Sequence, residues 1–169
     1  IFQHIADNYN LRVIYDAAHA FGVQDAGGSI LRHGDLSVLS FHATKVFNSI
    51  EGGAVTFQED WMEHRLNCLK NFGIVDQEHV VWVGGNAKMN EFQAAMGLCN
   101  LHHLDQEIDR RRLVVERYLS GLAGVPGIRL PSFREGLTPN YAYFPVVFDE
   151  KVFGASRNEV MEKLAENGI

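Results

Sequence analysis

Residues 11–22 read LRVIYDAAHAFG, in which a short apolar, β-rich run ends at Asp16. Residues 36–45 read LSVLSFHATK, in which a second run of the same kind leads into a polar stretch that ends at Lys45. Short apolar runs bounded by polar residues predict buried strands. Both sets of polar side chains are therefore predicted to lie at strand ends.

The chain around these two runs alternates between strand and helix patterns. Gly52-Gly53 opens a third β-rich run at residues 54–57, and residues 59–71 have helical composition. Asn90 is a predicted N-cap, with Gln93 three places on, for a helix with an apolar stripe. This alternation predicts an α/β fold built on a sheet.

A longer helix is predicted from about residue 104 to 122, with apolar residues at helical spacing and Arg and Glu on the opposite face. Beyond it the pattern changes to short strands at 128–130 and 141–148 and a helix that starts with the capping box Ser156 to Glu159. The predicted domains are 1–103 for the latter part of a large domain, 104–124 for a connecting helix, and 125–169 for the beginning of a small domain.

Composition excludes several classes of protein. The chain has 169 residues, 46% of them apolar, with a formal net charge of -6. Its one dense basic run, residues 110–112, follows acidic residues, so a nucleic-acid surface is not expected. No apolar stretch approaches the roughly 20 residues of a membrane span, and cytoplasm is the expected location. Eight histidines form no His-x-x-x-His pattern, so no metal site is expected.

The sequence at each end of the chain has the pattern expected inside a longer protein. The sequence opens inside an apparent helix, residues 2–9, with Asn10 as a C-terminal cap, and closes at Gly168-Ile169, just after another helix. We expect the chain to be a fragment of a longer protein.

Ligands of open α/β sheets bind beyond the carboxyl ends of the strands. The residues expected there, which we predict to share one site, are Asp16, His19, Ser40, His42 and Lys45.

Two of these residues have side chains suited to one chemistry. A lysine just past a buried strand is partly desolvated, which leaves a neutral amine able to attack an aldehyde. A carboxylate beside a pyridine nitrogen keeps that nitrogen protonated, and the ring then accepts electrons. Taken singly, an aspartate such as Asp16 after a strand is more often a turn former or helix cap, and a lysine such as Lys45 is more often a solvated charge.

Several ordered motifs together resemble the DegT-like family of nucleotide-sugar aminotransferases. They are YDAAHAFG at 15–22, GD at 34–35, SFHATK at 40–45, EGGA at 51–54 and GNAKMNEFQAA at 85–95. The resemblance implies a fold-type-I pyridoxal 5'-phosphate (PLP) transferase. This chain would hold the C-terminal part of its three-layer α/β/α large domain and the start of its small α+β domain. It also implies a homodimer with a shared active site.

The same resemblance implies roles by position. Lys45 is the expected Schiff-base lysine and proton shuttle, Asp16 the partner of the ring nitrogen, and Ser40 a phosphate ligand. His19 stands near the cofactor's 3-oxygen. Asn86 is expected to reach the cofactor phosphate of the partner subunit.

The implied reaction moves an amino group from glutamate to a keto group of a nucleotide-linked deoxysugar, in surface-polysaccharide (O-antigen) pathways. The stretch HATKVFN at 42–48 favours dTDP-4-keto-6-deoxyglucose. A dTDP-3-keto-6-deoxyhexose transaminase, another fold-type-I enzyme and a regulatory protein without catalysis remain as alternatives. His42 either faces the sugar or caps its own loop.

Overall fold

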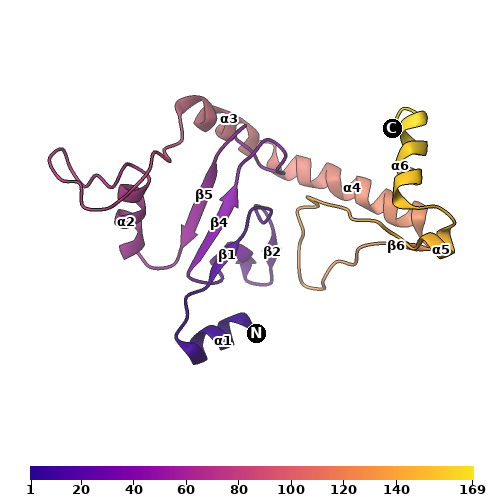
Figure 1. Ribbon diagram of the computed structural model, residues 1–169, viewed down its shortest axis with the longest axis horizontal. Coiled ribbons are helices and arrows are strands. Elements are labelled where there is room, and N and C mark those ends of the chain that lie inside the picture. Colours follow the sequence, from indigo (N-terminus) through magenta and orange to yellow (C-terminus); the bar gives the residue numbers. More distant parts are fainter.

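A computed structural model describes all residues of the chain and contains a three-stranded sheet in the order β1-β4-β5 (Figure 1). β1 (Ile14–Asp16) pairs in parallel with β4 (Leu36–Ser40), and β4 pairs antiparallel with β5 (Gly53–Phe57). Parallel strands bring their carboxyl ends to the same edge of a sheet. Asp16 and Ser40, the last residues of β1 and β4, therefore lie at one edge.

The approach to β4 is fixed by a glycine and an acid. Gly34 has φ 72°, and a Cβ there would lie 2.8 Å from the ring of Tyr15, so the turn requires glycine. The Asp35 carboxylate accepts a hydrogen bond of 2.7 Å from the Val13 backbone N–H and pairs with Arg12 at 2.7 Å. The Val13 N–H and then Arg12 lower the pKa of Asp35. These contacts hold the chain before β1 beside β4.

Two predicted capping boxes are confirmed. The Asn90 side chain accepts from the Gln93 N–H at the start of α3 (Glu91–Leu101), and the Gln93 side chain accepts in return from the Asn90 N–H. Ser156 and Glu159 make the same pair of bonds before α6 (Arg157–Glu166). The sequence predicts both helix starts because a capping box is a local pattern.

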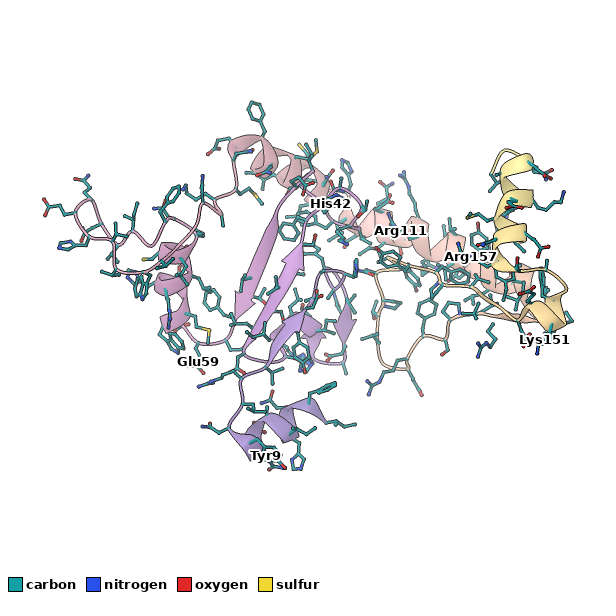
Figure 2. The ribbon with its side chains drawn as sticks, in the orientation of Figure 1. Tyr9, His42, Glu59, Arg111, Lys151 and Arg157 are labelled. Atoms are coloured by element: carbon teal, nitrogen blue, oxygen red, sulfur yellow. The ribbon has the colours of Figure 1, made fainter.

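The predicted long helix is α4 (Leu104–Leu122). It leads away from the sheet toward the C-terminal elements (Figure 1). Arg111 lies on its part nearer the sheet, and Arg157 lies among the C-terminal elements (Figure 2). None of the six helices combines the length and apolar character needed to cross a membrane.

The strand predicted at residues 141–148 is wrong over most of its length. Only β7 (Val147–Phe148) forms, and it pairs antiparallel with β6 (Ile128–Arg129). Tyr141 has φ 54°, and the Ala142 N–H donates to a side chain in place of a neighbouring strand. Pro145 has no N–H to give.

The helix predicted at 59–71 is shorter than expected, and small elements appear that were not predicted. α2 (Trp61–Leu69) ends where Asn71 pairs with Asn86 in an isolated bridge. The remaining elements are α1 (Phe2–Tyr9), β2 (Gln24–Asp25), β3 (Gly28–Ser29), the 3-10 turn η1 (Ile30–Arg32) and α5 (Glu150–Phe153). The α1 helix matches its prediction and ends at Asn10 with φ 51°.

The core gathers at the sheet edge that carries Asp16 and Ser40. Its buried members are Ala17, Leu39, Phe41 and Phe47, and the residues packed against them include Phe21 and Leu104. Only 14 of 169 residues are buried, so large apolar side chains remain exposed, Val83 fully and Phe92 at 85%. Apolar surface of this extent is typical of a face that contacts other protein.

Candidate active site

The loop between β4 and β5 is closed by its own main chain. The Phe41 N–H donates to the Gly52 carbonyl at 2.8 Å, and the Ser49 N–H donates to the Phe41 carbonyl at 2.9 Å. Ser49 is fully buried and donates its hydroxyl to the Glu51 carbonyl at 2.8 Å. A Cβ on Gly52, which has φ 152°, would lie 2.5 Å from the Ser49 hydroxyl. The glycine therefore allows the loop to close.

Three phenyl rings support the same loop. Phe47 stacks on Phe21 with ring centres 4.3 Å apart and meets the edge of Phe41 at 4.8 Å. Phe41 and Phe47 are buried. Lys45, two residues before Phe47, is thereby carried on a loop that is fixed by packing on one side.

Helix α3 holds the other side of the loop. Gly97 is buried, and a Cβ on it would lie 3.6 Å from Ser49 and 3.7 Å from Phe47. Asn100 donates its amide to the Asn48 carbonyl at 2.9 Å. A Cβ at this distance would make ordinary van der Waals contact, so the helix packs directly against the loop.

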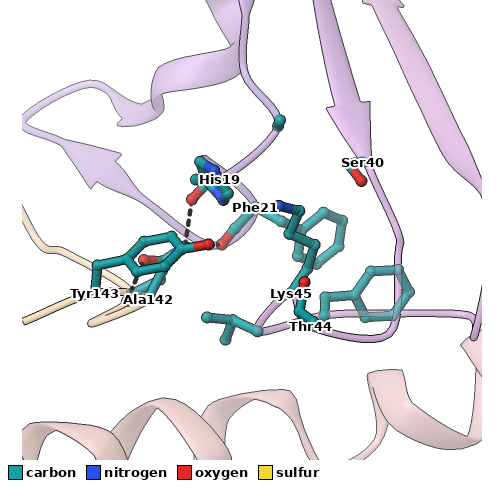
Figure 3. A pocket seen from close by; sticks show the side chains of 11 residues that line it. His19, Phe21, Ser40, Thr44, Lys45, Ala142 and Tyr143 are labelled. Carbon is teal, nitrogen blue, oxygen red and sulfur yellow. Dashed lines mark hydrogen bonds between the residues drawn. The ribbon is translucent and has the colours of Figure 1, made fainter.

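The structure brings three of the predicted site residues into one pocket. Lys45, Ser40 and His19 all line it, and the amino end of Lys45 is directed toward the turn that carries His19 and Phe21 (Figure 3). The other residues of the lining are Ala18, Phe21, Thr44, Val46, Phe47, Asn140, Ala142 and Tyr143. A lysine, a hydroxyl and an imidazole therefore face the same space.

The side chains of Lys45 and Asp16 make few polar contacts with the rest of the protein. Lys45 is half-buried, and its amine makes no hydrogen bond or ion pair. Asp16 is exposed at the end of β1, outside the pocket lining, and its carboxylate accepts only the Ala18 N–H at 3.1 Å. The amine is free to react with an aldehyde, and the carboxylate is free to pair with a cationic ring nitrogen.

His42 has the contacts of a residue that braces its own loop. Its Nδ1 atom lies 2.9 Å from the Thr44 hydroxyl and accepts from the Thr44 backbone N–H at 3.3 Å. A backbone N–H only donates, so Nδ1 carries no proton in this arrangement and Nε2 does. Nε2 lies 3.6 Å from a Glu51 carboxylate oxygen. His42 is not among the residues that line the pocket.

Asn86 also lies outside this pocket. Its side-chain oxygen accepts from the Lys88 amine at 2.9 Å, and the same amine donates to Asn71 at 2.9 Å. The Lys88 amine also stands 4.5 Å from the centre of the Phe72 ring. The asparagine is thus held in a small polar cluster away from Lys45.

Asn140 and Tyr143 complete one wall of the pocket and were missed by sequence reasoning. The buried Asn140 side chain donates to the backbone carbonyls of His19 at 2.7 Å and Phe21 at 2.9 Å. The Tyr143 ring meets the His19 ring edge-on at 4.8 Å. No local pattern signals a contact between positions 121 residues apart.

The other reactive side chains form no metal-binding cluster, and the Cys68 thiol lies 3.7 Å from the His64 Nε2 atom. No three His, Cys, Asp or Glu residues lie close enough to hold a metal ion. Cys68 and Cys99 are both free thiols.

Known proteins resemble the chain along almost its whole length. It is 46% identical over 165 residues to a Shigella dysenteriae dTDP-4-amino-4,6-dideoxy-D-glucose transaminase, a match covering 98% of this chain and 45% of that protein. It is 32% identical to a Streptomyces venezuelae dTDP-3-amino-3,4,6-trideoxy-alpha-D-glucose transaminase, covering 99% of the chain and 43% of that protein. The chain therefore spans less than half the length of these curated relatives.

Solved structures agree with the sequence comparison. DesI in the presence of its TDP-sugar product superposes with a TM-score of 0.88 at 39% identity, covering 96% of this chain and 42% of DesI. The PLP form of a Streptococcus pneumoniae sugar aminotransferase gives a TM-score of 0.83 at 27% identity, covering 98% of the chain and 44% of that protein. These matches confirm the predicted fold-type-I PLP-transferase fold.

The match to one family extends over residues 2–169. It confirms the family that the sequence motifs indicated. The chain belongs to the DegT/DnrJ/EryC1/StrS aminotransferase family.

Proposed function

We propose that the protein is a PLP-dependent aminotransferase that moves an amino group from glutamate to the keto group of a nucleotide-linked deoxysugar. The observation that carries the proposal is the uncommitted amine of Lys45 in a pocket shared with Ser40 and His19. The similarity to sugar transaminases over nearly the whole chain supports the same reading.

The donor set fits PLP. Lys45 offers an amine for the cofactor aldehyde, Ser40 offers a hydroxyl for its phosphate, and His19 stands in the same pocket. Asp16 ends the neighbouring parallel strand with a carboxylate free to keep a ring nitrogen protonated. When bound, PLP supplies an electron-accepting ring that stabilises negative charge on the substrate carbon.

In this proposal Lys45 performs two tasks. Its amine would hold the cofactor covalently through the cofactor's aldehyde carbon, and in its free form would carry a proton on and off the reacting carbon. The closed loop and the stacked Phe47 hold the backbone of Lys45 at the pocket that Ser40 and His19 also line. Positioning of this kind is what general acid–base catalysis requires.

The substrate that the resemblance favours is dTDP-4-keto-6-deoxyglucose, which would give the 4-amino sugar. Its support is the higher identity to the Shigella dysenteriae relative, named for a 4-amino sugar, than to the Streptomyces venezuelae relative, named for a 3-amino sugar. The 3-keto substrate is the second candidate. Retention of both Lys45 and Asp16 disfavours a regulatory protein without catalysis.

We further propose a homodimer in which Asn86 contributes to the partner's site, in the cytoplasm, within surface-polysaccharide biosynthesis. Exposed apolar side chains such as Val83 and Phe92 are available for contact with further polypeptide, either a partner subunit or the part of the protein outside this chain. Both substrates are charged small molecules that do not cross membranes unaided, so a cytoplasmic enzyme would meet them.

We also propose residues 1–103 as large domain, 104–124 as connection and 125–169 as small domain, since α4 leads from the sheet to the C-terminal elements.

The test compares the full-length protein with Lys45→Ala, each mixed with PLP. We expect a visible absorbance band in the wild type that glutamate bleaches, no such band in Lys45→Ala, and an unchanged band in the control Lys151→Ala, which alters an exposed lysine. Bleached enzyme is then offered the 4-keto and the 3-keto sugar nucleotide in turn. A band that persists in Lys45→Ala, or that glutamate leaves intact, contradicts the proposal.

A further inference from the structure

The small C-terminal region meets the pocket at one buried side chain, Asn140, which is 5% exposed. Its amide nitrogen donates to the carbonyls of both His19 and Phe21, and its oxygen accepts from the Ala142 N–H at 3.0 Å. Every hydrogen-bonding atom of the side chain is thereby used. Next to it, Thr138 and Gln24 exchange two backbone hydrogen bonds of 2.8 and 3.0 Å.

Asparagine is chemically required for this arrangement. The two carbonyls both need a donor, and the Ala142 N–H needs an acceptor, so the side chain must present an NH₂ group and an oxygen together. Aspartate has nearly the same shape but, when ionised, only accepts. It would turn two attractive contacts into oxygen–oxygen repulsion and leave two carbonyls without a donor.

The two carbonyls belong to the turn that faces Lys45. His19 lines the pocket with its ring edge-on to Tyr143, and Phe21 stacks on Phe47, two residues beyond the lysine (Figure 3). A displacement of the turn would therefore move the imidazole and the phenyl ring that line the same pocket as the reactive amine.

We propose that Asn140 is a positioning residue of the aminotransferase. Its amide fixes the backbone of the 19–21 turn, so that the His19 ring and the Lys45 loop meet the cofactor at one geometry. The effect on catalysis rests on the proposed function. The fixing of the 19–21 turn rests on the hydrogen bonds alone. The reacting groups themselves do not touch Asn140.

The deciding experiment uses full-length holoenzyme and the variant Asn140→Asp. We expect kcat to fall on the order of ten- to a hundred-fold, because small misplacements of catalytic groups have effects of this size. The KM for glutamate should change little. The pH at which the lysine-dependent visible band titrates should shift, since the His19 ring beside it moves. Lowering the pH protonates the introduced carboxyl and restores one donor, so the spectrum of the variant should come closer to that of the wild type recorded at the same pH.

Asn167→Asp is the matched control. Its amide also donates to a backbone carbonyl, that of Lys163 at 2.8 Å, but at the C-terminal cap of α6, outside the pocket. It introduces the same charge and should leave the spectrum and kcat unchanged. A lower unfolding midpoint for Asn140→Asp, with wild-type band titration and kcat in the folded fraction, would show a structural role alone and overturn the proposal.

Two measurements keep the test decisive if Asn140→Asp does not fold or PLP does not bind. Tyr143→Leu changes an exposed residue and removes the ring that packs on His19, so it should shift the band titration in the same direction. Amide hydrogen exchange without cofactor should quicken across residues 17–24 in Asn140→Asp. Unchanged exchange there would refute the positioning role, whereas absence of a wild-type band refutes only the aminotransferase assignment.

Discussion

Asp35, just before β4, binds the segment that precedes β1. Its carboxylate is 16% exposed and accepts from the Val13 N–H and from Arg12, which lowers its pKa. A lowered folded-state pKa gives stability that is complete above the unfolded value, about 3.9, and is lost as the pH falls through the folded-state value.

We expect Asp35→Asn to lower the urea midpoint of the full-length protein at neutral pH, because the variant keeps an acceptor for Val13 but loses the charge that Arg12 binds. The difference from wild type should stay constant above about pH 5 and shrink toward about pH 3. Urea titrations across this range measure it. A difference that grows on acidification would contradict the assigned direction of the pKa.

Single residues also mark the limit of sequence reasoning. The strand-end rule correctly placed Lys45, Ser40 and His19 around one space, because parallel β1 and β4 force their ends together. It predicted nothing about Asn140, whose partners lie far away in sequence. Positions that depend on a local pattern can be predicted from the sequence, and positions that depend on a long-range contact cannot.

The same distinction holds for helices and strands. The α3 and α6 helices begin where their capping boxes predict, and α4 has the predicted bounds. The expected strand at 141–148 failed because Asn140 takes up the Ala142 N–H and Tyr141 adopts φ 54°. The β2–β3 pair is only two residues long on each side, too short to have a periodicity.

Among these elements, the loop between β4 and β5 depends most on Phe47. Phe47→Ala should cost about 3–5 kcal/mol of unfolding free energy, the usual range for a buried phenylalanine, and should weaken the visible band of the holoenzyme. Phe47→Leu keeps more apolar volume and should cost less. Phe133→Ala, which alters a partly exposed ring outside the cluster, is the control. Denaturant unfolding and spectra give both quantities, and equal losses at Phe47 and Phe133 would count against the role of the cluster.

At the scale of the whole molecule, the proposed crossing of Asn86 to a partner subunit can be tested by hybrid dimers. Asn86 lies outside the pocket of its own chain. If it serves the partner, a heterodimer of Lys45→Ala with Asn86→Ala contains one site with both wild-type residues. If it serves its own chain, every site in the heterodimer lacks one of them.

We therefore expect co-expressed, doubly tagged heterodimers to regain glutamate-dependent turnover that each parent homodimer lacks. The control pairs Lys45→Ala with Asp16→Ala. Both residues are proposed to serve the site of their own chain, so each site of this heterodimer lacks one of them and no turnover is expected. Turnover equal to that of the control would place Asn86 in its own chain's site or in neither.

The two walls of the pocket have a consequence for the order of events during synthesis. Residues 18–47 leave the ribosome long before residues 140–143, yet both are needed to enclose Lys45. Domains form from the N-terminus as the chain emerges. Until the C-terminal region arrives, a nascent chain lacks the Asn140 and Tyr143 wall of the Lys45 pocket. We therefore expect the proposed cofactor to bind only after that region has folded.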